Sequence, residues 1–201
     1  MAVTTINLIL FDDFETLDAF GPAEVLGKLP LIYRIKCHSP NGGVVLSRQG
    51  IPADTLPFSA LDMSGILLIP GGKGTEQLVD EPDYIRQLKL FSEKAPYVLT
   101  VCTGSALLAK TGLLSGLKAT SNKKAFEWVC SQGPDTQWIR RARWVRDGKY
   151  YTSSGVSAGI DMSLGFIGDL HGQNTAEEIA RNIEYIWNRD PDDDPFCAEI
   201  Y

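Results

Sequence analysis

The sequence predicts an α/β protein whose central sheet is mainly parallel and carries an added antiparallel hairpin. Short apolar runs rich in β-branched residues alternate with longer amphipathic runs, which is the pattern of repeated βαβ units. Asp147-Gly148 separates two strand-like runs and has the composition of a two-residue hairpin turn. The 201 residues are 44% hydrophobic and 22% charged, so we expect one domain over residues 1–201 with a sizeable core.

In the first half of the chain, strand-like and helix-like runs follow one another closely. A loop through Asp18 leads to Gly21-Pro22, and a proline there fits the first turn of a helix that runs through Leu26. The other expected elements are strands at 6–11, 31–38, 65–69 and 97–101, and helices at 82–94 and 104–110.

The second half adds the hairpin and two long helices. Asn122 is placed to cap a helix through Val129, and Thr175 opens a capping box for a last helix that ends near Asn188. We expect strands at 118–121, 138–145 and 149–152, a helix from 158 to about 170, and an irregular tail over 189–196.

Composition argues against several functional classes. A net charge of -6 and a pI near 4.9 disfavour nucleic-acid and anionic-membrane partners, which require clustered Lys and Arg. Four Cys without a Cys-x-x-Cys pair predict neither a disulfide framework nor a metal site. No run approaches the ~18 apolar residues of a membrane span, and the N-terminus does not resemble a leader, so we expect a soluble, cytoplasmic protein. One basic cluster is interpreted as a solvated strand face: Arg140, Arg141, Arg143 and Arg146.

Cys102 is the residue that most directly predicts chemistry. It lies between a short β-branched strand and an apolar helix, so it occupies a strand-to-helix turn. The positive end of the helix and its unpaired N–H groups favour a thiolate, and we expect an acidic, reactive nucleophile there. Cys37, Cys130 and Cys197 have no such context and are interpreted as ordinary core or tail residues.

Two other strand ends are expected to lie near Cys102. Ligands of open α/β sheets bind beyond the carboxyl ends of the strands, and the loop with Asp18 and the Gly71-Gly72 turn both follow strands. The sequence therefore predicts that Asp18, Gly71-Gly72 and Cys102 converge on one site.

Several motifs together resemble the ThiJ/PfpI superfamily, a flavodoxin-like relative of the class I glutamine amidotransferases. They are Ile69-Pro70-Gly71-Gly72, Val101-Cys102-Thr103-Gly104-Ser105 and Thr152-Ser153-Ser154-Gly155-Val156-Ser157-Ala158-Gly159-Ile160-Asp161. Leu17-Asp18 followed by Gly21-Pro22, with the Cys-Thr-Gly-Ser elbow, is similar to the isocyanide hydratase branch. The resemblance extends from the first strand to Tyr185 and the Pro195-Phe196 tail, and it implies a flavodoxin-like three-layer sandwich.

The resemblance also implies a mechanism. Cys102 would attack the terminal carbon of an isocyanide, with Asp18 as acid and base, and the product would be an N-substituted formamide. The backbone N–H groups of Gly72 and Thr103 resemble oxyanion donors, and the N–H of Val156 would steady the sulfur. The resemblance implies no cofactor, a small-molecule substrate and a homodimer.

Three further residues complete these expectations. Gly71 and Phe20 are expected to contact the substrate, with Phe20 as part of an apolar wall. Asp161, in the Ala-Gly-Ile-Asp stretch, is interpreted as a structural carboxylate.

The chain departs from the family pattern at two places, and these leave alternatives open. Many superfamily members carry His directly after the nucleophilic Cys, where this chain has Thr103, and neither His38 nor His171 matches a motif position. Asn122 and Lys123 replace a His-Trp pair of isocyanide hydratases. The alternatives are a redox or stress sensor whose cysteine is oxidised without turnover, and a glyoxalase-like or amidase-like enzyme.

Overall fold

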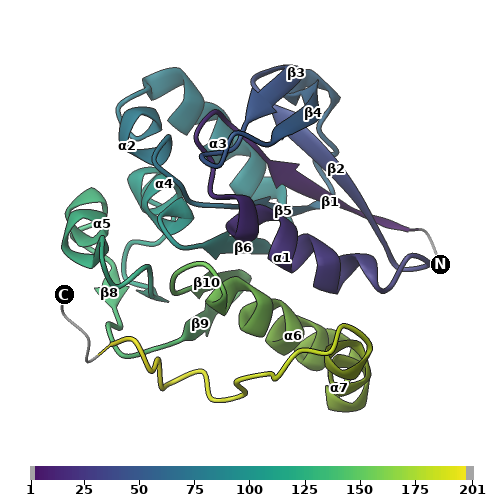
Figure 1. Cartoon of the computed structure of the whole chain (residues 1–201). Helices are drawn as coiled ribbons and strands as arrows, with labels where there is room; N and C mark the ends of the chain where they lie inside the picture. Colours follow the sequence, from purple (N-terminus) through teal and green to yellow (C-terminus); the bar gives the residue numbers. More distant parts are fainter. Residues whose placement is uncertain (1–2, 198–201) are drawn as a thin grey trace.

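A computed structural model describes residues 3–197 and contains, in that range, an eight-stranded sheet between two layers of helices (Figure 1). The strands of this sheet are β1 (Thr4–Ile9), β2 (Tyr33–Ser39), β3 (Asn41–Leu46), β4 (Pro52–Pro57), β5 (Ile66–Ile69), β6 (Val98–Val101), β9 (Trp144–Asp147) and β10 (Tyr150–Ser153). Their order is β3-β4-β2-β1-β5-β6-β10-β9. Neighbours from β4 to β10 pair in parallel, whereas β3–β4 and β9–β10 are antiparallel. The predicted α/β class and the β9–β10 hairpin are therefore confirmed.

Helices cover both faces of this sheet. On one face lie α1 (Thr16–Gly27), α6 (Ala158–His171) and α7 (Gln173–Asn182). On the other lie α2 (Thr75–Leu78), α3 (Pro82–Lys94) and α4 (Gly104–Lys110), and α5 (Phe126–Gln132) packs beside α4. Two short strands, β7 (Lys118–Ala119) and β8 (Gln137–Trp138), pair in parallel apart from the main sheet.

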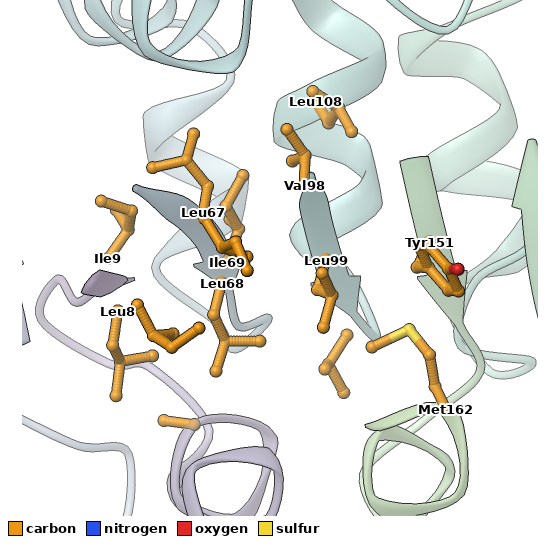
Figure 2. Close-up of a cluster of buried hydrophobic side chains, with 14 of the residues drawn as sticks. Leu8, Ile9, Leu67, Leu68, Ile69, Val98, Leu99, Leu108, Tyr151 and Met162 are labelled. Carbon is orange, nitrogen blue, oxygen red and sulfur yellow. The ribbon is translucent and has the colours of Figure 1, made fainter. Parts of the chain in front are cut away.

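The central strands are buried on both faces, which accounts for their continuous apolar sequences. All four residues of β5 and of β6 are buried. Leu67 and Val98 point toward the side where Leu108 of α4 lies, and Leu68 and Leu99 point to the opposite side, toward α1 and α6 (Figure 2). This alternation buries both helical layers against one sheet.

The start of α1 differs from the expectation. The helix begins at Thr16, so Asp18 lies in its first turn and Pro22 lies inside it. Pro22 has no N–H to donate to the carbonyl group of Asp18, which would ordinarily end a helix. The helix continues through Pro22 because α1 packs closely on α6. The packing is so close that a Cβ added at Gly21 would lie 2.9 Å from Ile160. The prediction that the helix starts at Gly21-Pro22 is wrong because this contact outweighs the local signal.

Other elements also differ from the expectation. The expected strand over 138–145 is divided into β8 and β9, because the backbone N–H groups of Arg143 and Trp144 donate to the carbonyl group of Pro191 instead. The last helix, α7, begins before Thr175 and ends at Asn182, six residues short of Asn188. The β3–β4 hairpin was not predicted.

Candidate active site

The carboxyl ends of β1, β5 and β6 meet at one edge of the sheet, as predicted. Phe14, after β1, forms an isolated β-bridge with Gly72, after β5. The N–H of Glu15 donates to the carbonyl oxygen of Gly71 over 2.8 Å. These contacts tie the segment before α1 to the turn after β5, and they bring Asp18 to the turn that carries Cys102.

The backbone of Cys102 is held in an uncommon conformation. Its φ is 57°, in the left-handed region, where a residue other than glycine costs on the order of 1–3 kcal/mol. The N–H of Cys102 lies 3.2 Å from the carbonyl oxygens of Ser153 and Ser154. Its own carbonyl oxygen accepts from the hydroxyl groups of Ser105 (3.0 Å) and Ser121 (2.8 Å). The surrounding segments therefore fix the turn that presents the sulfur.

The side chains of Asp18 and Cys102 are buried together and hydrogen-bonded to each other. Asp18 is 0% exposed and Cys102 is 7% exposed. Oδ2 of Asp18 accepts from the N–H of Gly71 over 3.0 Å, and the N–H of Val156 contacts both members of the pair. Oδ1 of Asp18 has no hydrogen-bond partner in residues 3–197. One carboxyl oxygen is therefore anchored, and the other is buried without a partner.

Burial determines how this pair holds its protons. It raises the pKa of Asp18 to about 7, against the opposing effect of the Gly71 N–H, and the charge of Glu15 adds to the rise. Burial and the neighbouring carboxylate also raise the pKa of the Cys102 thiol well above its usual range. The expected acidic thiol is thus wrong, because both effects outweigh the end of the seven-residue helix α4. Above about pH 7 the two groups share one proton.

The two expected oxyanion donors, the N–H groups of Gly72 and Thr103, have different partners in the structure. The N–H of Thr103 faces the Cys102 sulfur, and the N–H of Gly72 donates to the Thr103 hydroxyl over 3.0 Å. Gly71 lies behind them, where an added Cβ would be 2.6 Å from the Thr103 nitrogen and 2.9 Å from Asp18. A glycine is therefore required at position 71 so that the strand ends can approach one another.

A cavity of about 390 Å³ lies over Cys102. Its lining includes Gly72, Thr103 and Val156 but neither Gly71 nor Phe20. Phe20 instead lines a separate groove between α1 and residues 182–185. The structure therefore does not support the expectation that Gly71 and Phe20 contact a substrate at Cys102: Gly71 is covered by its neighbours, and Phe20 lies on a face of α1 outside this cavity.

Asn122 is a site residue that sequence reasoning assigned only as a cap. Its Oδ1 accepts from the N–H groups of Lys124 (2.8 Å) and Ala125 (3.1 Å), which organises the turn before α5. Its amide also reaches the Cys102 sulfur. The replacement of the family's His-Trp pair at Asn122-Lys123 was the one signal that could have pointed to this role.

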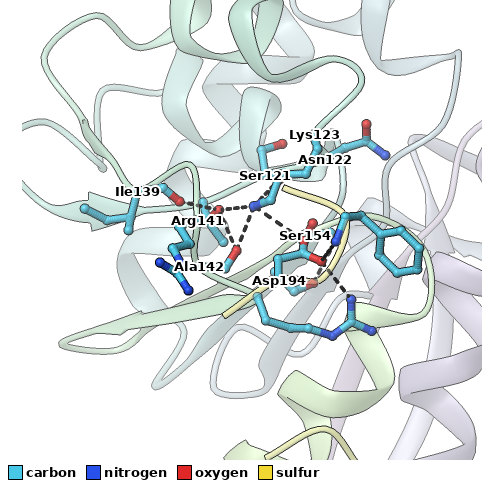
Figure 3. Close-up of polar contacts among 12 residues, drawn as sticks. Ser121, Asn122, Lys123, Ile139, Arg141, Ala142, Ser154 and Asp194 are labelled. Atoms are coloured by element: carbon cyan, nitrogen blue, oxygen red, sulfur yellow. Dashed lines mark hydrogen bonds and ion pairs between the residues drawn. The ribbon is translucent and has the colours of Figure 1, made fainter. Parts of the chain in front are cut away.

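Lys123 points away from the cavity into a buried polar cluster (Figure 3). Its ammonium donates to the carbonyl oxygen of Ala142 (2.7 Å) and to the Thr120 hydroxyl (3.1 Å). The ammonium also lies 3.6 Å from the carboxylate of Asp194, and the two side chains are only 8% and 0% exposed. The tail of the chain therefore packs directly behind the residue that follows Asn122.

Arg143 belongs to the same cluster. Its guanidinium pairs with Asp161 at 2.7 Å and with Asp194 at 3.3 Å, and its side chain is 6% exposed. The interpretation of Arg143 as part of a solvated strand face is wrong, because the tail covers it. Asp161 also accepts from the N–H of Asn188 at 3.0 Å, in agreement with a structural role.

Within residues 3–197, no group of three or more His, Cys, Asp or Glu side chains is placed to hold a metal ion. His171 contacts the Tyr33 hydroxyl at 2.6 Å, and neither His171 nor His38 lines the cavity over Cys102. No helix in this part of the chain is long and apolar enough to cross a membrane.

A cysteine on a strained strand-to-helix turn, with a carboxyl group hydrogen-bonded to it at the carboxyl edge of a parallel sheet, defines a class of α/β proteins with a nucleophile elbow. Residues 4–168 match the DJ-1/PfpI family, and the chain belongs to this family, also known as ThiJ/PfpI.

The chain is similar to several known proteins. The chain is 30% identical over 181 residues to an isonitrile hydratase from Pseudomonas putida, covering 90% of this chain and 78% of that protein. A ThiJ/PfpI family protein from Pseudomonas syringae has a TM-score of 0.82 at 28% identity, covering 92% of this chain and 76% of the other. The transcriptional regulator GbdR from Pseudomonas aeruginosa is 27% identical over 90% of this chain, which spans only 50% of the regulator.

Proposed function

We propose that this protein is a cofactor-free hydratase that adds water to isocyanides and releases N-substituted formamides. The observation that carries the proposal is the buried Asp18–Cys102 pair, in which the carboxyl group has a pKa of about 7 and one unpartnered oxygen. A group with that pKa can both accept and donate a proton near neutral pH. Similarity to an isonitrile hydratase supports the choice of substrate.

In the first half of the reaction, the sulfur of Cys102 attacks the terminal carbon of R–N≡C. The thiol proton passes to the carboxylate of Asp18 and then to the same carbon, so a neutral thioimidate, R–N=CH–S–Cys102, is formed. Because the thiol has a raised pKa, this transfer to Asp18 is what makes the sulfur nucleophilic. The amide of Asn122 and the N–H of Val156 stabilise the charge on sulfur during the attack.

In the second half, water adds to the thioimidate carbon. Asp18 accepts a proton from the water and passes it to the imine nitrogen, which gives the neutral adduct R–NH–CH(OH)–S–Cys102. The C–S bond of this adduct then breaks. The hydroxyl proton of the adduct returns through Asp18 to the sulfur, which restores the thiol and releases R–NH–CHO. The two halves together consume one isocyanide and one water.

The test is formamide production from an alkyl isocyanide by the wild-type protein, Cys102→Ala and Asp18→Asn. We expect turnover by the wild type, none by Cys102→Ala, and a loss of about 100-fold or more in Asp18→Asn. Cys130→Ala is the matched control, since that thiol lies on α5 outside the cavity, and it should retain activity. Methylglyoxal and a peptide serve as competing substrates. Turnover of methylglyoxal above that of the isocyanide would replace the hydratase by the glyoxalase-like alternative.

We also propose that the protein is a homodimer. Leu17 and Phe20 of α1 are 43% and 36% exposed, and this apolar face would be covered by a second copy. Light scattering coupled to size exclusion measures the mass directly, and a value of one chain at working concentration contradicts the proposal.

A further inference from the structure

A second cavity adjoins the one over Cys102. It has a volume of about 220 Å³ and shares Asn122, Lys124 and Val156 with the first cavity. Two of these shared residues, Asn122 and Val156, also contact the Cys102 sulfur. The two cavities therefore meet at Asn122 and Val156, beside the sulfur.

The far wall of this second cavity is suited to an apolar group. The ring of Phe196 lines it and is 53% exposed. Gly155 lets the Asn122 amide lie close to the backbone, because an added Cβ would be 2.5 Å from the Asn122 nitrogen. Lys123 contributes only its aliphatic stem, because its ammonium is bound to Ala142 and Asp194 on the other side. A volume of about 150 Å³ is enough for one benzene molecule inside a protein, so a single ring fits this cavity.

Phe196 is held in place by the buried cluster behind it. Asp194 is 2% exposed, and its N–H donates to the carbonyl oxygen of Arg141 over 2.8 Å. Oδ1 of Asp194 accepts from the N–H of Phe196 over 3.1 Å. The guanidinium of Arg143 lies 6.0 Å from the centre of the Phe196 ring. The backbone that carries the ring is thus anchored to Asp194, which lies in the buried cluster (Figure 3).

We propose that the second cavity binds the N-substituent of the substrate, and that Phe196 determines specificity for substituents with one ring. The inference rests on the proposed function for the identity of the reactive group. Because an isocyanide is linear and small, its carbon reaches Cys102 while the substituent projects away from the sulfur. Catalysis then depends on the pair at Cys102, and selection among substrates depends on the tail.

Two assays on wild type and Phe196→Ala test the subsite. The first compares kcat/KM for cyclohexyl isocyanide and methyl isocyanide, and we expect a loss of about tenfold for the ring substrate and less than about twofold for the methyl one. The second compares alkylation of Cys102 by N-cyclohexylchloroacetamide and by chloroacetamide, followed by mass spectrometry. It should show the same selective loss without requiring any turnover. Leu90→Ala is the control, since this α3 side chain is 46% exposed and lines neither cavity.

The outcomes separate the two hypotheses. Absence of isocyanide turnover in the wild type, with a ring-selective change in alkylation, rejects the hydratase and retains the subsite. An unchanged ring-to-methyl ratio in both assays rejects the subsite, even if isocyanides are hydrated. An equal loss for both substrates also rejects it, because Phe196 would then support the position of Cys102 and not the substituent.

Discussion

Replacing Asp18 by Asn should stabilise the fold at neutral and alkaline pH while lowering turnover by about 100-fold or more. Burial raises the pKa of this carboxyl group from 3.8 to about 7. Below pH 3.8 it is protonated in both the folded and the unfolded chain, so burial costs no ionisation energy. As the pH rises toward 7, the unfolded chain ionises and the folded chain does not. The free energy of unfolding therefore falls by about 1.36 kcal/mol per pH unit, or about 4 kcal/mol in total.

Asn has nearly the same shape, its Oδ1 can still accept from the Gly71 N–H, and it does not ionise. Urea unfolding monitored by tryptophan fluorescence measures the difference between Asp18→Asn and wild type. We expect the stability advantage of the variant to grow by about 3 kcal/mol between pH 5 and pH 8. Asp83→Asn, whose side chain in the wild type is 79% exposed, is the control and should show no such growth. An advantage that stays constant with pH would refute the argument that Asp18 is destabilised by burial.

Three further predictions concern the same residues and their supports. The kcat/KM for isocyanide hydration should rise with pH to a plateau, with an apparent pKa of about 7, because the reactive Asp18–Cys102 pair must hold one proton. Initial rates that do not vary between pH 5.5 and 8.5 would contradict this. Alkylation of Cys102 by iodoacetamide at pH 8, followed by mass spectrometry, should be slower in Asp18→Asn, because burial keeps the thiol pKa high and the variant lacks the carboxylate that accepts the thiol proton; a faster reaction would count against Asp18 as the base. Arg143→Met leaves Asp161 without its buried cation and Asp194 with Lys123 alone, and it should lower the free energy of unfolding by about 3–5 kcal/mol in urea titrations; a loss under about 1 kcal/mol would show that the cluster is solvated.

The main features of the fold were predictable because the central strands are buried on both faces. Such strands read as continuous apolar runs, and β5 and β6 were identified on that basis. The β3–β4 hairpin carries no such signal: it lies at the edge of the sheet, and most of its residues are exposed or only partly buried. The start of α1 was missed for a different reason, since Pro22 is a strong local signal that packing on α6 overrides.

The site was predictable in its position and not in its electrostatics. Parallel strands end at one edge, so the approach of Asp18, Gly71-Gly72 and Cys102 was expected because each of these segments follows a strand. The raised pKa of the thiol depends on how completely neighbouring segments cover it, and no local pattern reports that. The burial of Arg143 depends on Asp194, 51 residues further along the chain.

The buried cluster at the tail also determines when the protein can complete its fold during synthesis. Lys123 and Arg143 are made well before Asp194, and the pocket wall at Phe196 follows later still. Until residue 194 has emerged, Lys123 lacks its carboxylate partner and Arg143 has only Asp161, so the segment carrying Asn122 lacks the support of the tail behind it. The segment around Cys102 is thus synthesised long before the tail residues that complete the pocket around it. Chains interrupted before residue 194 should accordingly depend on chaperones or be degraded.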